Sequence, residues 1–324
     1  MKRGFAALAV VGIAAAVAVF TLNSAPFSGL NLRYKSDSAF VKYLAKYGKS
    51  YENLEEYEMR KALFEERMSL VTDHNAQNDQ TWFMAVNQFS DMLPHEISKM
   101  MGGGIDGEHR EHLEVIPQEP VVRGGTPVDW RSKMNPVRNQ GSCGSCWSFA
   151  ATAAFEGRYA IKKGSKVELA EQQMVDCSTA NGGCGGGWSS KALQYIQTIG
   201  GQMSRASYPY TGVKGSCKFS ASKVAAKISA VSGVAVAKSA VASGPVAVYL
   251  EAGATFQGYG GGIFNGVCGQ YNHAVTVVGW GASGASEYWI IRNSWGTGWG
   301  ESGHIRVLIG GNCRITFDSY PIVA

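Results

Sequence analysis

The order of apolar and charged positions divides the chain into a helical region and a β-rich region. Between residues 38 and 76, apolar and charged residues recur every three or four positions, which is typical of an amphipathic helix. Residues 146–163 are rich in alanine and predict a further helix. Three later runs, 274–280, 288–291 and 304–308, have the composition of strands. The pattern therefore predicts an α+β protein whose later half is mainly β.

The first 25 residues differ from the rest of the chain. Lys2 and Arg3 precede an uncharged stretch, residues 4–22, that is built largely from Ala, Val, Ile and Phe. This arrangement is typical of a secretory signal peptide, or of a signal anchor if it is not cleaved. Both alternatives predict that the protein enters the secretory pathway. From there it would be secreted or delivered to a lysosomal or endosomal compartment, where disulfides persist.

Composition and charge support a folded protein with two oppositely charged regions. Of 324 residues, 45% are hydrophobic and 17% are charged, which is ordinary for a globular chain. Residues 26–123 carry 11 Lys and Arg against 16 Asp and Glu, whereas residues 124–324 carry 17 against 9. The two regions, with net charges of −5 and +8, are expected to attract each other.

A candidate nucleophile, Cys146, lies in the run Gln-Gly-Ser-Cys-Gly-Ser-Cys-Trp at residues 140–147. His273 and Asn293 follow it by 127 and 147 residues. A Cys-Gly-Ser-Cys-Trp signature with a histidine and an asparagine at these distances resembles the papain family of cysteine proteases. Zinc binding is the alternative use of Cys143 and Cys146, but no second Cys-x-x-Cys pair or histidine cluster accompanies them.

The resemblance extends from about residue 38 to the C-terminus. It implies a papain-like two-lobe α+β fold, with a helical lobe, a β-barrel-like lobe and the active cleft between them. It also implies a preceding helical propeptide. We therefore expect a signal segment at residues 1–25, an inhibitory propeptide at 26–123 and a peptidase domain at 124–324. The glycine-containing and proline-containing stretch 100–125 is predicted to be a linker, and the activation cut is expected between Val121 and Thr126.

Two motifs carry the resemblance to a cathepsin L-like propeptide. One stripe of the predicted helix is similar to the ERFNIN motif, with Arg and Val replacing two motif residues; it consists of Glu56, Arg60, Phe64, Arg67, Val71 and Asn75. A second motif, with Ala in place of Gly, is matched by Ala85, Asn87, Phe89 and Asp91. Their presence in this order supports the predicted propeptide.

The expected chemistry is nucleophilic attack by a thiolate. Cys146 begins the alanine-rich helix, where the helix dipole favours an anion, and His273 can hold the thiol proton. The predicted resting state is a thiolate–imidazolium pair. Asn293 would orient the imidazole, and Trp295 would shield that hydrogen bond from water. The side chain of Gln140 and the backbone N–H of Cys146 are expected to form an oxyanion hole.

The resemblance also assigns the residues that bind substrate. The backbone of Gly185, Gly186 and Gly187 is expected to pair with an extended peptide, since glycine lets two backbones approach closely. The other expected contacts are Gly144, Trp188, Tyr249, Asn272, Ala274 and Trp295, with Phe317 or Asp318 at the floor of a pocket. The bulk of Trp188 and Tyr249 predicts that this pocket binds an apolar residue just upstream of the scissile one. A floor formed by Asp318 would instead admit Arg.

All seven cysteines follow residue 142. If Cys146 stays free, the other six can pair in many ways, and the residues alone do not decide among them. The resemblance implies the disulfides Cys143–Cys184, Cys177–Cys217 and Cys268–Cys313. Each would contribute about 3–4 kcal/mol to stability.

Together these features predict a cysteine endopeptidase that is made as a zymogen and hydrolyses polypeptides through an acyl-enzyme. Its own propeptide and cystatin-like proteins are the expected inhibitors, and we expect a monomer that binds no nucleic acid. No metal or organic cofactor is implied. A non-catalytic binding homologue would lack one of the four predicted catalytic residues. An exopeptidase of the same fold would need an insertion that blocks one end of the cleft. The sequence keeps all four predicted catalytic residues and shows no such insertion.

Overall fold

The computed structural model describes residues 28–103, 125–234 and 237–324, and it divides into two units, Met1–Lys49 and Ser50–Ala324. In the first unit the described part is one helix, α1 (Ser28–Tyr47). The predicted signal segment, residues 1–25, lies outside the described residues. Within the described ranges, no helix is long and apolar enough to span a membrane.

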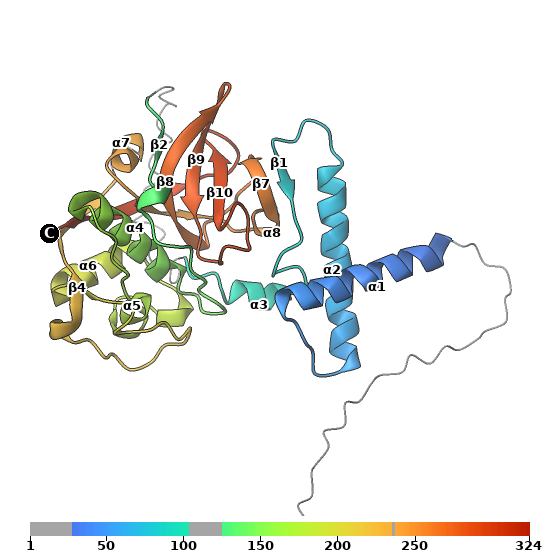
Figure 1. The fold of residues 1–324 in the computed structure, drawn as a ribbon, viewed down its shortest axis with the longest axis horizontal. Helices are drawn as coiled ribbons and strands as arrows, with labels where there is room; N and C mark the ends of the chain where they lie inside the picture. Colours follow the sequence, from blue (N-terminus) through green and yellow to red (C-terminus); the bar gives the residue numbers. More distant parts are fainter. Residues whose placement is uncertain (1–27, 104–124, 235–236) are drawn as a thin grey trace, which may run out of the picture. The chain divides into compact units, whose positions relative to one another are not determined.

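The second unit contains the remaining elements (Figure 1). Its helices are α2 (Leu54–Asn75), α3 (Pro94–Ser98), α4 (Cys146–Lys163), α5 (Glu171–Cys177), α6 (Ser189–Ile199), α7 (Ala237–Ala242) and α8 (Ala254–Gln257). Its strands are β1 (Trp82–Met84), β2 (Val128–Asp129), β3 (Gln202–Met203), β4 (Val224–Ala226), β5 (Ile228–Gly233), β6 (Val246–Leu250), β7 (Tyr259–Phe264), β8 (His273–Ser283), β9 (Ser286–Arg292), β10 (His304–Leu308) and β11 (Thr316–Val323).

The helical period between residues 38 and 76 corresponds to two helices, where the pattern predicted one. Gly48 ends α1 in a left-handed conformation, with φ of +62°. Asn53 then caps α2, because its side-chain oxygen accepts a hydrogen bond from the N–H of Glu56 at 2.9 Å. Both residues favour a break over a continuous helix, and periodicity alone did not show it.

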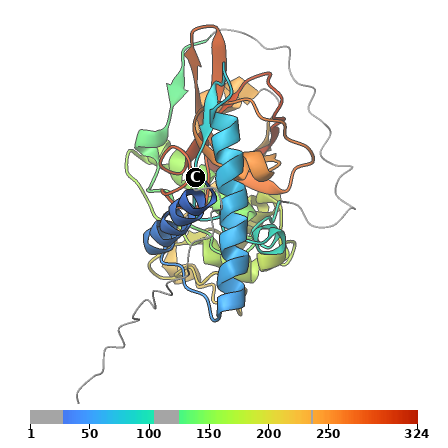
Figure 2. The same ribbon diagram turned by 90° about the vertical axis from the view of Figure 1, so that its right-hand side faces the viewer.

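The predicted stripe on α2 makes the contacts that hold the neighbouring segments. Arg60 donates to both carboxylate oxygens of Glu96 on α3, at 2.5 and 2.7 Å, and to the carbonyl of Asp91 at 3.1 Å. At the other end, Asn75 exchanges two hydrogen bonds with the backbone of Met84, at 2.8 and 2.9 Å. β1 therefore lies beside the C-terminal end of α2 (Figure 2).

A large sheet joins the N-terminal segment to the later part of the chain. Its order is β1-β7-β10-β9-β8-β6-β11-β5, with β2 also paired to β8. β7 and β10 are parallel, and the other pairs along this path are antiparallel. β1 pairs with β7 at the edge, with Trp82 opposite Gly262. Residues 82–84 therefore extend the sheet of the region that follows.

The two largest apolar cores of the described residues support the predicted division into a helical part and a β part, which is confirmed. One core lies within the sheet and includes Trp289, Trp295, Trp299 and Phe317. The other surrounds α4, whose bounds match the predicted helix, and it includes Trp147. The three predicted strand runs lie within β8, β9 and β10. The side chain of Trp299 is fully buried.

The structure contains the three disulfides that the resemblance implied. Cys143 pairs with Cys184, Cys177 with Cys217, and Cys268 with Cys313, while Cys146 is free. The first of these bonds links the turn that precedes α4 to a glycine-rich loop. That loop and the start of α4 are both parts of the candidate site.

The Arg60–Glu96 ion pair should make the 50–103 segment sensitive to acid. Hydrogen bonds from Arg60 lower the pKa of Glu96 from 4.5 to about 2. A carboxylate with a depressed pKa stabilises the fold above its unfolded-state pKa, and this contribution is lost as the pH falls from about 4.5 toward 2. Glu96→Gln should therefore weaken the protection of residues 50–103 from hydrogen exchange at pH 7. The further loss of protection between pH 4.5 and 2 should be smaller in this variant than in the unchanged protein. The matched control is Glu66→Gln, at an exposed position on α2. An unchanged profile in the Glu96 variant would contradict this assignment.

Candidate active site

Cys146 is the first residue of α4 and is fully buried. The turn before it is held by the disulfide at Cys143 and by a 2.7 Å hydrogen bond from the N–H of Ser145 to the carbonyl of Cys143. Trp147 anchors the start of the helix, since its indole N–H donates to the carbonyl of Gly183 at 3.1 Å. The thiol therefore lies at the positive end of an 18-residue helix, where a thiolate is favoured.

His273 and Asn293 are brought together by two adjacent strands. His273 begins β8, and Asn293 directly follows β9. The His273 Nε2 atom is 2.8 Å from Asn293 Oδ1, which also accepts from the N–H of Ser294. Because that oxygen is an acceptor, Nε2 carries the proton and Nδ1 of a neutral ring can accept one. The ring of Trp295 stacks on the imidazole with centroids 4.7 Å apart.

The same arrangement places Cys146 against β8. The backbone N–H of Ala274, next to His273, donates to Cys146 Sγ at 3.4 Å. Three of the predicted catalytic side chains, Cys146, His273 and Asn293, are therefore neighbours, although they come from separate parts of the chain. Across the described ranges, no group of three or more His, Cys, Asp or Glu residues is placed to hold a metal ion.

Gln140 is also buried, and its amide is fixed at both ends. Its Oε1 atom accepts from Ser294 Oγ at 2.5 Å, while its Nε2 atom donates to the carbonyls of Cys143 at 2.9 Å and Met100 at 2.8 Å. The backbone N–H of Gln140 donates to the carbonyl of Ser294 at 2.9 Å. Ser294 therefore sets the orientation of the amide, a role that the sequence did not suggest.

Residues 100–103 pass directly over this site. The N–H of Gly103 donates to the carbonyl of Asn272 at 2.8 Å, and the N–H of Gly187 donates to the carbonyl of Gly102 at 3.0 Å. A β-carbon added at Gly102 would lie 1.8 Å from Gly144 O, and one at Gly103 would lie 2.5 Å from the backbone nitrogen of His273. Only glycine fits here. The prediction of a linker over 100–125 was therefore wrong for residues 100–103, because these glycines serve close backbone approach.

The covering segment runs parallel to the glycine-rich loop where it passes Gly187. Its Met100 carbonyl contacts Gln140, and the later Gly103 lies between Gly187 and Asn272. The remaining predicted linker, residues 104–124, and with it nearly all of the predicted cut region, lie outside the described residues.

Burial shifts the pKa values of the two central groups. Burial raises the pKa of the Cys146 thiol to about 11, although N–H groups of Ala274 and Gly102 act in the opposite direction. Burial also lowers the pKa of His273 to about 4, against the effect of Asn293. Both shifts favour the neutral thiol and neutral imidazole. The ion pair thus stays a prediction for the uncovered site.

The residues predicted to form the pocket gather on one side of the site. Trp188 and Tyr249 are buried, with ring centroids 5.1 Å apart, and Ala274 lies in the same apolar cluster. Tyr271, which we did not predict, contacts both rings at 5.9 and 6.0 Å. The sequence signal that could have identified Tyr271 was its position directly before Asn272, a predicted pocket residue.

The structure separates the two candidates for the pocket floor. Asp318 Oδ2 accepts a hydrogen bond from the N–H of Ser190 at 2.9 Å, at the start of α6. Phe317 instead packs against Trp289 in the core of the sheet, with centroids 5.3 Å apart. A register shift in β11 between Phe317 and Ser319 turns Asp318 toward the pocket residues. Asp318 therefore contacts the start of α6, which directly follows Trp188, and interacts electrostatically with Tyr249.

Glycines shape the rest of the predicted binding surface. The N–H of Gly144 donates to the carbonyl of Cys184 at 3.0 Å, and a β-carbon at Gly144 would lie 2.5 Å from that oxygen. Gly186 has φ of +116°, which side-chain-bearing residues rarely adopt. At Gly187 a β-carbon would meet Asn181 and Trp147. Because these residues carry no side chain, the loop can pack closely against the start of α4.

Comparison with known proteins identifies the class. Residues 125–322 match the family described as papain family cysteine protease, and residues 40–97 match the cathepsin propeptide inhibitor domain (I29). Digestive cysteine proteinase 2 of Homarus americanus is 36% identical over 87% of this chain and 93% of its own. Caricain of Carica papaya is 40% identical over 81% of this chain and 78% of its own.

Solved structures agree with these matches. Digestive procathepsin L 3 of Tenebrio molitor superimposes with a TM-score of 0.76 at 34% identity, covering 89% of this chain and 99% of that one. The chain belongs to the papain family of cysteine proteases. Its fold is papain-like, it is a zymogen, and its own propeptide is an inhibitor domain. Polypeptides are its substrates.

Closure of the cleft by the backbone of Gly102 and Gly103 can be tested by adding one methyl group. Gly103→Ala should lift the covering segment and speed labelling of Cys146 in the intact zymogen by a thiol-directed epoxide. We expect about a tenfold increase, since overpacking costs about 1–3 kcal/mol. Labelling would be measured at neutral pH before any processing, with the exposed Gln77→Ala as the matched control. A rate equal to that of the unchanged zymogen would rule out steric closure by this backbone.

Proposed function

We propose that Cys146 is the nucleophile of an endopeptidase, that His273 is its base, that Asn293 orients the imidazole and that Gln140 stabilises the oxyanion. The observation that carries this proposal is the contact between Gln140 Nε2 and the Met100 carbonyl at 2.8 Å. This contact supports the proposal, because a peptide carbonyl from residues 100–103 accepts a hydrogen bond from the amide that would polarise a substrate carbonyl. The donor lies within the distance that an oxyanion hole requires.

The reaction follows from the placement of the proton. His273 takes the thiol proton at Nδ1, and Cys146 Sγ attacks the scissile carbonyl carbon. The resulting oxyanion accepts hydrogen bonds from Gln140 Nε2 and the backbone N–H of Cys146. The imidazolium then gives its proton to the leaving amine, and an acyl-enzyme remains. A water molecule, deprotonated by His273, attacks the thioester and releases the acid with the thiol restored.

Removal of the covering segment would expose three groups at once. Gly187 would regain a free N–H, Asn272 a free carbonyl, and Gln140 one of its amide hydrogens. The first two can pair with an extended peptide. Water entry would at the same time reduce the desolvation that keeps Cys146 and His273 neutral, so the ion pair becomes favourable.

Several further properties belong to the same proposal. We place the boundary between propeptide and peptidase near residues 123 and 124, and the secretory signal at residues 1–25. The mature enzyme would be a monomer in a lysosomal or endosomal compartment or outside the cell. Cystatin-like proteins are the proposed external inhibitors, since they too would have to occupy the cleft.

Gln140→Ala should lower kcat by roughly 10²–10³, with little change in KM, because the donor acts mainly on the oxyanion. Cys146→Ala should abolish turnover. Both would be measured on enzyme processed from the full chain, with active sites counted by epoxide titration in the Gln140 variant. An unchanged kcat for Gln140→Ala would remove this residue from the oxyanion hole.

Substrate preference should depend on pH through Asp318. Burial raises the pKa of this carboxyl to about 6. Below pH 6 the uncharged Asp318 carboxyl and the rings of Trp188 and Tyr249 favour Leu, Val or Phe just upstream of the scissile residue. Above pH 6 the carboxylate can pair with Arg.

Cleavage of peptides with Arg at this position should therefore rise roughly tenfold between pH 5 and 7, following the ionised fraction of Asp318. Asp318→Asn should remove the rise and keep the apolar preference. Asp129→Asn, on β2, serves as the control. The ratio of Arg-peptide to apolar-peptide cleavage should change with pH in the unchanged enzyme. A ratio that is independent of pH would contradict a floor formed by Asp318.

A further inference from the structure

Arg292 is a buried arginine at the end of β9, directly before Asn293. It is only 5% exposed, and its guanidinium donates from Nη1 to the carbonyl of Asn135 and from Nη2 to the carbonyl of Pro136, both at 2.7 Å. A planar guanidinium holds two acceptors in a fixed geometry and stays charged when it is buried. These two bonds therefore attach the end of β9 to the segment that begins at Asn135.

That segment ends at Gln140 and lies beside the residues that follow Arg292. The N–H of Gln140 donates to the carbonyl of Ser294 at 2.9 Å, and the N–H of Gly296 donates to the carbonyl of Arg138 at 3.0 Å. Asn139 also bridges to Trp295 in antiparallel register. The oxyanion donor and the orienting amide of Asn293 are thus carried on two paired segments, and the side chain of Arg292 joins the two at a second point.

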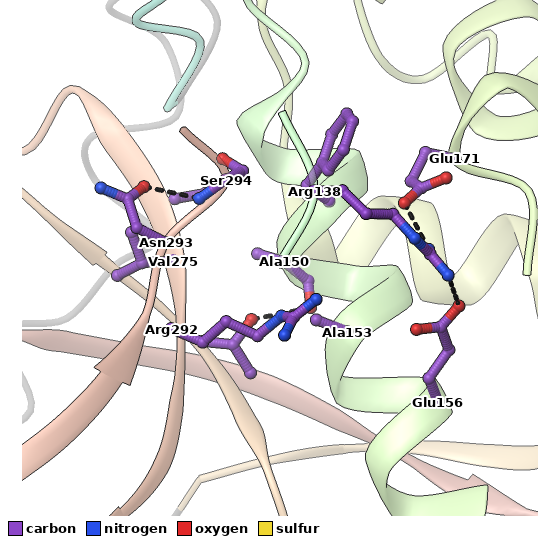
Figure 3. Close-up of a pocket in the computed structure, with 12 residues that line it drawn as sticks. Arg138, Ala150, Ala153, Glu156, Glu171, Val275, Arg292, Asn293 and Ser294 are labelled. Carbon is purple, nitrogen blue, oxygen red and sulfur yellow. Dashed lines mark hydrogen bonds and ion pairs between the residues drawn. The ribbon is translucent and has the colours of Figure 1, made fainter. Parts of the chain in front are cut away.

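Arg292 also lies beside a buried ion cluster (Figure 3), formed by Arg138, Glu156 and Glu171. Arg138 is 2.8 Å from Glu156 on α4 and 2.6 Å from Glu171 on α5. The two carboxylates are almost completely buried. Arg292 and this cluster line one small pocket together with Ala150, Ala153 and Asn293. The region therefore connects the helix that begins at Cys146 with both paired segments.

We propose that Arg292 is a positioning residue, whose bonds to the Asn135 and Pro136 carbonyls hold Gln140 in register with Asn293. This inference rests on the roles proposed above for Gln140 and Asn293. Misplacement of a catalytic group by about 1 Å can cost roughly 10² in rate, so a distant clamp can matter for the chemical step. A lysine would keep the positive charge but lacks the planar fork that grips two carbonyls.

The test compares Arg292→Met and Arg292→Lys in enzyme processed from the full chain by immobilised, unchanged enzyme. Active sites are counted by epoxide titration of Cys146, so loss of folded protein alone does not alter kcat per site. Arg292→Met should lower kcat roughly 10- to 100-fold with KM within about twofold, and Arg292→Lys roughly 3- to 10-fold. Arg306→Met, on the adjacent strand β10, is the control and should retain full activity.

If Arg292→Met does not fold, Arg292→Lys decides the matter, and full kcat per titrated site in that variant overturns the proposal. A second measurement combines Arg292→Lys with Gln140→Ala. If Arg292 acts through Gln140, the double variant should lose little more than Gln140→Ala alone, whereas fully multiplied losses overturn the proposal. Full kcat in Gln140→Ala would refute the proposed function itself. Impaired Gln140→Ala with unimpaired Arg292 variants would refute only the role of Arg292.

Discussion

The site depends on a short backbone pairing between two segments that are 154 residues apart at Gln140 and Ser294. The backbone bond between these residues, the bond from Gly296 to Arg138 and the side-chain bond from Ser294 to Gln140 all belong to this contact. Each hydrogen bond contributes only about 1 kcal/mol, but a buried group left unpaired costs about 1–3 kcal/mol. The pairing is therefore strongly favoured over a shifted register. It places an amide donor and an orienting asparagine on the two sides of one contact.

The covering segment, residues 100–103, uses the polar groups around this contact. Its backbone engages Gln140, Gly187 and Asn272, and its glycines allow an approach that any side chain would block. Cys146 and His273 are fully buried beneath these residues, and burial moves both pKa values toward the neutral pair. We propose that steric closure and the shift toward the neutral pair share one cause, which is the passage of residues 100–103 through the cleft.

The sequence was most informative where a local rule determines structure. The alanine-rich helix at Cys146–Lys163, the three strand runs and the disulfide pattern of the resembling family all agree with the structure. The proximity of Cys146, His273 and Asn293 followed from a motif with characteristic spacing. In these cases, periodicity or motif spacing carried enough information.

Features that depend on long-range packing could not be predicted. The glycines at 102 and 103 indicate a flexible linker until the neighbouring Gly144 and His273 are placed. The orientation of Asp318 depends on a bulge in β11, and a bulge reverses the alternation of faces from which strand residues are assigned. Ser294 contributes through Gln140, a partner that is distant in sequence, so no local pattern singles it out.

The most direct test of this account is the ionisation of the His273 imidazole, followed by NMR on isotopically labelled histidine in the intact zymogen and in the processed enzyme. We predict a neutral ring in the zymogen at pH 5–7, since burial lowers its pKa to about 4. After processing, the ring should be an imidazolium over the same range, and alkylation of Cys146 should discharge it. An imidazolium in the zymogen, or a neutral ring in both forms, would contradict the claim that covering the cleft neutralises the catalytic pair.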